Sequence, residues 1–564
     1  MPEILTQKEK IALLGFFVLF GAALLWLFFA FYYNNTEIGP VRGGKFIEGA
    51  VGTPRYGNPI FAASDIDRDL TKLMFSGLVK YGKNGELVPD LAERFEISED
   101  QKTYVFYLRQ NAKWHDGENL TADDIIFTAQ TIQNPEYKSP LRPNILGAEI
   151  EKIDGFTVKF SLKQPYAPFL ENLAFGVIPK HIWANIPLQS AALADYNIEP
   201  VGSGPYKFSD FVKDRNGVIQ SYSLAANEEY FSGEPYVSEI TFKFYNSDDE
   251  LIEAAKKGEI GGFSQSSTKN LSLIKNLPDF QIKTLKMPRY YAVFFNQQKS
   301  KILADTAVRT ALDLAAPRQE IIAEVLENQG VEAHSPIHQE SFAYDPEIKN
   351  PVFDREKADE LLKNAGWKDE DGDGFLEKIT VKKISKTKTE TEEIPLEFEL
   401  VTSQSEMLKQ TAEILKKYWE EIGVKVNLKI VDNADLQQNY LTGRNYDALL
   451  FGEVMSQDPD VFAFWHSSQK KSPGLNIAVY DNKNADKLLE EARQTVDAEK
   501  RKKKYFDFQT IVAKDKPAIF LFNPYYIYAL NSEIKGAETE NIALPSLRFA
   551  DIENWHIRTG RRWR

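Results

Sequence analysis

Residues 89–128 have the sequence PDLAERFEISEDQKTYVFYLRQNAKWHDGENLTADDIIFT. Within this stretch, 103–108 (TYVFYL) is rich in β-branched and aromatic residues, a composition typical of a strand. The dipeptide Asp116-Gly117 predicts a turn. Thr121 and the two acids after Ala122 predict a helix through about residue 132, because threonine caps helix N-termini and acids suit the first turn. The stretch therefore predicts a strand, a turn and a helix in succession.

The C-terminal half repeats this mixture of strands and helices. Apolar residues recur at helical spacing through 404–422, and Gly423 follows as a helix C-cap. The segments on either side, 396–401 (LEFELV) and 424–430 (VKVNLKI), are predicted strands. Strand–helix–strand is the unit of a sheet covered by helices, so the pattern predicts an α/β fold. Five further segments have predicted structures. Residues 157–162 are predicted to be a strand, and 378–393 an exposed charged hairpin or loop. Helices are predicted at 355–365, 484–497 and 499–513.

Composition excludes several functional classes. The chain has 564 residues and a net charge of −14, so it lacks the basic surface expected of a nucleic-acid binder. It contains no cysteine, which excludes disulfides, thiolate metal sites, cysteine nucleophiles and a lipid anchor built on cysteine.

The N-terminus predicts a membrane-spanning helix. Residues 11–33 contain no charged residue, and as a helix they span about 34 Å, enough for the roughly 30 Å hydrocarbon layer. Lys8 and Lys10 precede this run and favour an N-terminus inside the cell. We interpret 1–33 as a cytoplasmic stub and uncleaved transmembrane anchor, and 34–44 as a tether; a cleaved signal is the alternative. The globular part is then expected outside the cytoplasm, in the periplasm or on the cell surface.

Several motifs resemble one known family, the family 5 extracellular solute-binding proteins. These are the peptide, dipeptide and nickel receptors of ABC importers. The similarity begins in 89–128 and covers about residues 45–535. It continues in family order through GSGPYKF (202–208), AVFFN (292–296), VRTALDLAAPRQEII (308–322), DREKADELLKNAGW (354–367), the helix–strand unit at 404–430, YDALLFGEVMSQDPDVFAFWH (446–466) and PAIFLF (517–522).

The resemblance implies a two-lobed, periplasmic-binding-protein-like α/β fold of the large peptide-binding class (type II) with an inserted subdomain. Ligand would bind between lobes that close about a hinge. The two segments crossing between lobes are expected near Tyr290–Phe294 and Pro517–Phe522. The expected division is lobe I from 45–72, 196–290 and 515–553, the inserted subdomain at 73–195, lobe II at 291–514, and a basic C-terminal tail at 554–564.

The resemblance also makes the acids near residue 458 candidate ligand-binding residues. In peptide-binding relatives, an Asp four residues before the Pro of a similar turn pairs with the ligand's α-amine. Here the turn is Asp458-Pro459, and Met455 occupies that position. Glu453 replaces the Trp that commonly follows the motif glycine. We therefore hypothesise that Glu453 or Asp458 supplies the negative charge for the ligand's amine. The alternative is that both are ordinary loop carboxylates.

Further candidate ligand-binding residues follow from position. Tyr290, Tyr291 and Asn296 are at the expected first crossing. Aromatic residues after the Asp-Pro turn would line ligand pockets or pack in the core. These are Phe462, Phe464, Trp465 and His466.

No catalytic or metal site is predicted. His115 and Asp116 are interpreted as a structural strand end and turn. Asp369, Asp371 and Asp373 resemble the start of a calcium loop, but Thr380 stands where the loop requires Glu. There is no GxSxG or HExxH motif, so hydrolysis has no visible machinery.

The sequence thus predicts a receptor without cofactor or enzymatic activity. Its expected partners are a peptide-like ligand, the permease and ATPase subunits of an ABC importer, and the membrane, and the protein is expected to be a monomer. A membrane-anchored sensor, or a binder of another solute without transport, is the alternative function.

Overall fold

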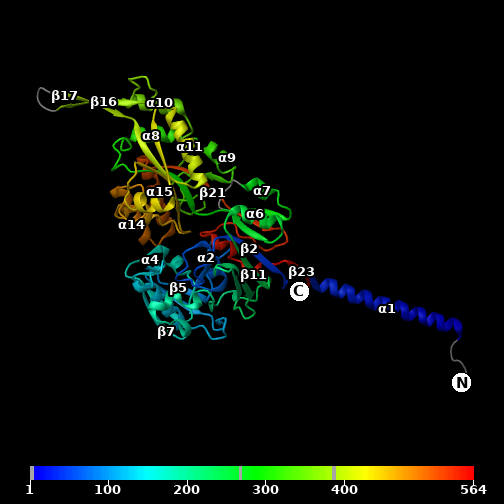
Figure 1. Cartoon of the computed structure of the whole chain (residues 1–564). Helices are drawn as coiled ribbons and strands as arrows, with labels where there is room; N and C mark the ends of the chain where they lie inside the picture. The colour runs from blue at the N-terminus through cyan, green and yellow to red at the C-terminus, as the bar shows by residue number, and fades with distance from the viewer. Residues whose placement is uncertain (1–5, 266–269, 384–388, 564) are drawn as a thin grey trace.

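The computed structural model describes residues 6–265, 270–383 and 389–563. A globular body carries one long helix, α1 (Gln7–Asn35), which projects away from it (Figure 1). No side chain of α1 is buried, and α1 is long and apolar enough to cross a membrane. The helix predicted at 11–33 is therefore confirmed, while its role as an anchor stays a prediction.

A seven-stranded mixed sheet is built from distant parts of the chain. Its centre is β2 (Lys45–Val51), which pairs in parallel with β11 (Glu239–Tyr245) and with β12 (Gly262–Gln265). The outer strands are β10 (Ile219–Ala226) and β9 (Tyr206–Lys213) on one side, and β22 (Tyr526–Asn531) and β13 (Phe280–Leu285) on the other. Helices α2 (Asp65–Met74), α6 (Asp248–Lys256) and α7 (Leu271–Lys275) belong to the same region.

A second, six-stranded sheet is buried on both faces. Its strand order is β15 (Gly330–Glu332), β21 (Ala518–Pro524), β14 (Arg289–Phe295), β20 (Ala448–Val454), β18 (Glu397–Ser403) and β19 (Lys425–Val431). Successive side chains of a strand point to opposite faces, and in β14 Val293 enters one core while Phe294 enters the other. The first core contains residues of α8 (Thr306–Leu314), α9 (Arg318–Glu324), α10 (Arg355–Asn364) and α11 (Glu406–Glu420). The second contains residues of α14 (Lys483–Gln494) and α15 (Ala498–Asp515).

Residues 89–128 contribute two strands to a third, four-stranded antiparallel sheet. The strand order is β5 (Ala92–Ile97), β6 (Thr103–Leu108), β8 (Thr157–Ser161) and β7 (Glu149–Asp154). Helix α3 (Ala122–Gln133) packs on it, and the Thr121 backbone N–H donates to Asp124 Oδ2 over 2.9 Å. The short elements are β3 (Val79–Tyr81), β4 (Leu87–Pro89), α4 (Arg142–Ile145), α5 (Lys180–Trp183), α12 (Asn433–Asp435) and α13 (Phe462–Trp465).

Most predicted elements of the C-terminal half are confirmed. The helix predicted at 404–422 is α11, and its flanking strands pair in parallel as β18 and β19. The charged segment 378–393 is a hairpin of β16 (Glu377–Lys383) and β17 (Thr389–Pro395), with 384–388 outside the described residues.

Two details differ from the sequence-based expectation. The tether predicted at 34–44 contains a strand, β1 (Thr36–Val41), which pairs with β23 (Arg558–Trp563) from the predicted basic tail. The expected crossing segment Tyr290–Phe294 lies within β14 of the six-stranded sheet. The other, Pro517–Phe522, lies within β21 except for Pro517, which directly precedes the strand. The chain instead passes between the two large sheets at 286–288 and at Tyr525. The expected division into lobes and a subdomain stays a prediction.

Candidate functional site

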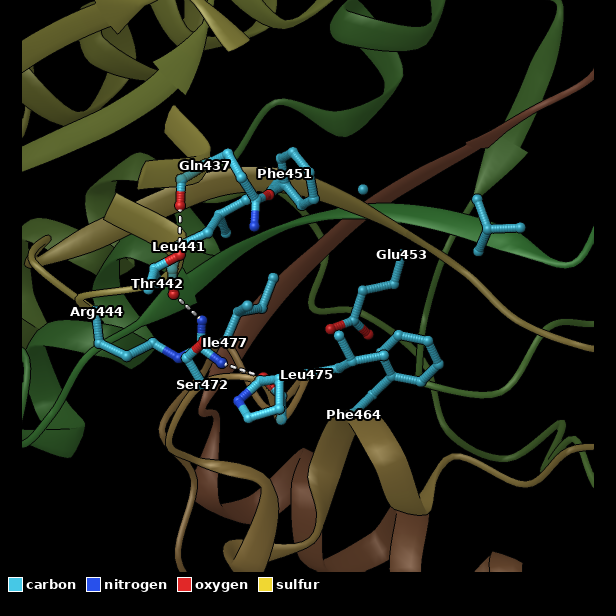
Figure 2. A pocket seen from close by; sticks show the side chains of 14 residues that line it. Gln437, Leu441, Thr442, Arg444, Phe451, Glu453, Phe464, Ser472, Leu475 and Ile477 are labelled. Carbon is cyan, nitrogen blue, oxygen red and sulfur yellow. Dashed lines mark hydrogen bonds between the residues drawn. The ribbon is translucent and has the colours of Figure 1, made fainter. Parts of the chain in front are cut away.

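A pocket of about 300 Å³ lies beside the C-terminal end of β20 (Figure 2). Its walls come from β20, from the helical turn at Leu436–Leu441 and the residues after it, from α13, and from the loop at 472–477. The lining combines apolar side chains with a few polar groups, as small-molecule sites usually do. It includes Gln437, Leu441, Thr442, Arg444, Phe451, Glu453, Phe464, Leu475 and Ile477.

Glu453 is the acid in this lining, and one of its oxygens is unsatisfied. Its side chain is buried, with Oε2 accepting a hydrogen bond from the Tyr290 hydroxyl. Oε1 is buried without a hydrogen-bond partner among the described residues. Burial raises the pKa of Glu453 to about 8, although the Tyr290 hydrogen bond and the positive charge of Arg444 oppose the shift. In an empty pocket at neutral pH the carboxyl is therefore mostly protonated.

Two aromatic residues hold Glu453 in place. Tyr290 lies directly opposite Glu453 in the β14–β20 pair. Trp465 Nε1 donates to the Tyr290 hydroxyl over 3.2 Å, and Trp465 is fully buried. Burial and the neighbouring Glu453 raise the pKa of Tyr290 well above its ordinary value, so the phenol stays a donor. These two hydrogen bonds, from Trp465 to Tyr290 and from Tyr290 to Glu453, fix the orientation of the carboxyl group.

Arg444 organises the opposite wall of the pocket. Its guanidinium donates to the backbone carbonyls of Lys470 (3.1 Å) and Gly474 (2.6 Å), and also to that of Leu441. Asn296 Nδ2 in turn donates to the Arg444 carbonyl over 2.9 Å. Arg444 forms no ion pair among the described residues. Figure 2 shows Glu453 and Phe464 on one side of the pocket and Arg444 on the other.

Asp458, the second acid considered from the sequence, is already neutralised. Arg501 binds it through two hydrogen bonds of 2.8 and 2.5 Å, and both side chains are largely buried. The backbone N–H groups of Gln457 and Asp458 donate to the Glu171 carboxylate, each over 2.9 Å. Glu171 also accepts a hydrogen bond from the Tyr81 hydroxyl. This turn therefore joins the region around 81 and 171 to the end of β20, and its charge is not available to a ligand.

The remaining predicted residues lie around the pocket without lining it. Tyr291 stacks on Phe522, with ring centroids 5.2 Å apart. Phe462 stacks on His466 at 4.1 Å, and the His466 ring also contacts Glu490 at 3.2 Å. Asn296 does not line the pocket itself but donates a hydrogen bond to the carbonyl of Arg444, which does. Among the sequence-predicted residues, the pocket brings together Glu453 and Phe464.

Sequence reasoning missed most of the opposite wall. Arg444 has a positive φ of 51°, uncommon for a residue with a side chain, and this conformation turns the chain after the helical segment. The signal available in the sequence was Gly443 beside Arg444, a typical turn-forming neighbour. Gln437 and Ile477 carried no such signal, since their positions depend on the packing of separate segments.

The acidic loop at 369–373 is not part of this site. The carboxylates of Asp369, Asp371 and Asp373 lie within 4.8 Å of one another and are exposed. They accept hydrogen bonds from backbone N–H groups of their own turn, such as Gly372 N to Asp369 at 2.7 Å. Thr380 lies in β16, where its hydroxyl donates to the Glu392 carbonyl.

Comparison with known proteins gives a consistent result. Residues 86–475 match the family described as bacterial extracellular solute-binding proteins, family 5 Middle. The chain is 29% identical over 526 residues to the oligopeptide-binding protein AppA of Bacillus subtilis, covering 92% of each chain. The structure of that protein in complex with a nonapeptide is similar with a TM-score of 0.72, at 28% identity, 92% coverage of this chain and 100% of that one. NikZ from Campylobacter jejuni in complex with Ni(L-His) is similar with a TM-score of 0.73, at 27% identity, covering 91% of this chain and 99% of that one.

Proposed function

The chain belongs to family 5 of the bacterial extracellular solute-binding proteins, and on that premise we propose that it is the receptor of an ABC importer for oligopeptides. The family consists of solute-binding proteins rather than enzymes. The similarity to oligopeptide-binding AppA extends over nearly the whole length of both chains, which supports a peptide as the ligand. The receptor would deliver its peptide to a membrane permease driven by an ATPase.

The proposed mechanism is closure of two lobes around the peptide. It is supported by the two large sheets, which are joined by the short segments 286–288 and Tyr525. Short connections between rigid units are where hinges absorb a change in backbone angles. A ligand that contacts both lobes stabilises the closed state by its difference in affinity for the two states.

The pocket beside β20 would hold one positively charged group of the peptide, and this observation supports the proposal most directly. Glu453 lines a cavity of about 300 Å³, and its Oε1 is buried without a hydrogen-bond partner among the described residues. An unsatisfied buried acceptor is costly, which favours a role that a ligand completes. A volume of this size accommodates a terminus or a side chain but not an entire oligopeptide. The α-ammonium of the peptide is the group we assign to Glu453.

Calorimetry with the purified full-length chain tests this function. A peptide library, or the peptides that co-purify with the protein, would be titrated with free and with N-acetylated termini. Reversible binding without turnover is expected, with weaker binding after acetylation. If no peptide binds while another solute does, the peptide assignment is wrong; if free and acetylated peptides bind equally, the assignment of the pocket is wrong.

A further inference from the structure

The end of the chain is attached to the end of the long N-terminal helix. Strand β23 pairs antiparallel with β1, which begins at the residue directly after α1. The register places Trp563 opposite Thr36, and Arg558 opposite Val41. The two-stranded ribbon therefore starts at the last turn of α1 and leads into the globular body (Figure 1).

Aromatic side chains gather at this junction. The Trp563 ring lies 6.0 Å from the Phe31 ring and 5.9 Å from the Tyr32 ring. Trp563 and Phe31 are nevertheless about three-fifths exposed (62% and 60%). Tryptophan and tyrosine concentrate where a membrane meets water, because one end of each ring system is apolar and the other polar. The junction has the composition of such an interface.

Arg561 of β23 lies beside the same helix end, while Arg558 lies at the other end of the ribbon, opposite Val41. The Arg561 guanidinium donates to the Thr36 hydroxyl over 2.9 Å and to the Tyr33 and Thr36 carbonyls, and it lies 3.8 Å from the Tyr33 ring centroid. A cation here satisfies carbonyls that the helix leaves unpaired and opposes the negative end of its dipole. Arg562 pairs with Glu37 at 3.0 Å. Neither Arg558 nor Arg561 has a carboxylate partner within the described part of the chain, and both are exposed.

We propose that the β1–β23 ribbon and the last turn of α1 form a membrane collar, which binds the phosphate headgroups of anionic phospholipids in the leaflet outside the cytoplasm. Helix α1 has 29 residues and spans about 43 Å, more than the hydrocarbon layer of about 30 Å, so its last turn reaches the headgroup region. There Arg561 meets phosphates of opposite charge, and Arg558, at the far end of the ribbon, adds a second positive charge without a carboxylate partner among the described residues. The collar adds lipid binding to the transport function and fixes the orientation of the body on the membrane.

The full-length chain in lipid nanodiscs tests the collar. Because the protein has no cysteine, Thr559→Cys gives a single labelling site on β23 for an environment-sensitive fluorophore. Nanodiscs of phosphatidylcholine, with and without phosphatidylglycerol, would carry a headgroup-attached quencher. We expect phosphatidylglycerol to increase quenching and high salt to reverse the increase. Each arginine near an anionic surface should raise the ratio of bound to free collar about fivefold.

Matched variants separate charge from other effects. Arg558→Gln with Arg561→Gln should abolish the response to phosphatidylglycerol, and the corresponding Lys pair should retain it. Lys500→Gln with Lys514→Gln removes the same charge from α15, distant from α1 in Figure 1, and should leave the response intact. Equal quenching in both lipids, or a full response in the arginine-to-glutamine pair, would overturn the proposal. An intact mass showing that residues 1–33 are removed in cells would also overturn it.

Discussion

Replacing Glu453 by Gln should weaken ligand binding and at the same time stabilise the ligand-free receptor. Glutamine keeps the size of the side chain and an oxygen that accepts from the Tyr290 hydroxyl, but it cannot carry a charge. Breaking a buried, hydrogen-bonded charge pair costs about 2–5 kcal/mol in binding. The dissociation constant of a free-amine peptide should therefore rise at least about thirtyfold. N-acetylation of the peptide should weaken binding to the wild type and change binding to the variant much less.

The effect on stability has the opposite sign. Burial raises the pKa of Glu453 from its ordinary 4.5 to about 8, so the folded state holds a proton that the unfolded state releases. Stability of the free receptor therefore falls as pH rises from about 4.5 to 8, by about 5 kcal/mol if that pKa shift acts alone. The Gln variant lacks this loss. Urea unfolding should show it to be more stable than the wild type at pH 9 and similar at pH 4.

The ionisation of the Glu453 carboxyl should also make ligand affinity depend on pH. A peptide α-amine has a pKa of about 8, near that of Glu453 in the empty pocket. Below pH 8, binding must remove a proton from Glu453, so affinity falls by up to about tenfold per pH unit. Above pH 8, the peptide amine must first gain a proton. The profile should peak near pH 8 in calorimetry, and the Gln variant should lose its acidic limb.

Either of two results would show that Glu453 does not bind the peptide's amine. One is a Gln variant that binds free and acetylated peptides as the wild type does. The other is a Gln variant that is less stable than the wild type at every pH, which would make Glu453 an ordinary structural acid.

Four further substitutions test other parts of the structure. Asp458→Asn breaks the buried pair with Arg501 and should lower stability in urea by about 3 kcal/mol. Discrimination against acetylated peptide should persist, and its loss would show that Asp458 belongs to the ligand-binding site. Arg548 pairs with two buried acids, Glu48 at 2.9 Å and Asp69 at 2.5 Å. Arg548→Met leaves both acids without this partner and should lower stability in urea by about 3–5 kcal/mol; a loss under about 2 kcal/mol would show that the ion pairs do not stabilise the fold. Glu171→Gln weakens the hydrogen bonds to the turn at 457–458 and should speed ligand release in stopped-flow measurements; an unchanged release rate would exclude a role in closure. Asp371→Ala should leave the melting temperature unchanged with or without calcium, because no bidentate Glu closes that loop, and a calcium-dependent rise lost in the variant would show a metal site.

The regular elements were predictable because local chemistry determines them. The strand at 103–108 coincides with β6, and the helix predicted from Thr121 is α3. Alternating apolar residues and a helix bounded by a cap and a glycine gave the β18–α11–β19 unit. In each case the signal is contained within about twenty residues, so a single sequence carries it.

The ends of the chain were predicted less well, for a physical reason. Segment 34–44 is polar and contains glycine, and 554–564 is basic, so each resembles a flexible segment when considered alone. Strand pairing between them satisfies backbone groups across more than 500 residues of chain, and no local pattern reports such a partner. The same limit applies to the segments expected to cross between the lobes. They fall on β14 and β21, and no local pattern reports the pairing of these strands in the six-stranded sheet.

The site shows the same division between local and distant information. The sequence identified an acidic stretch that lacks the usual anchor, but it could not rank Glu453 against Asp458. The difference between them is a partner 43 residues away, because Arg501 binds Asp458 while Glu453 Oε1 is left with none among the described residues. An acid is useful to a ligand only if the protein has not already neutralised it.

This condition also explains how recognition and closure would be coupled. Without a ligand, burial keeps the Glu453 carboxyl mostly protonated near neutral pH, so the protein does not retain a full unpaired charge there. A peptide ammonium favours the ionised form, and the attraction between the two charges grows as closure removes water from the pocket. In the proposed mechanism the charge pair would therefore be stronger in the closed state than in the open one. A ligand shifts a conformational equilibrium only by such a difference in affinity, so in the proposed mechanism Glu453, which would bind the ligand's charge, would also contribute to closing the two lobes.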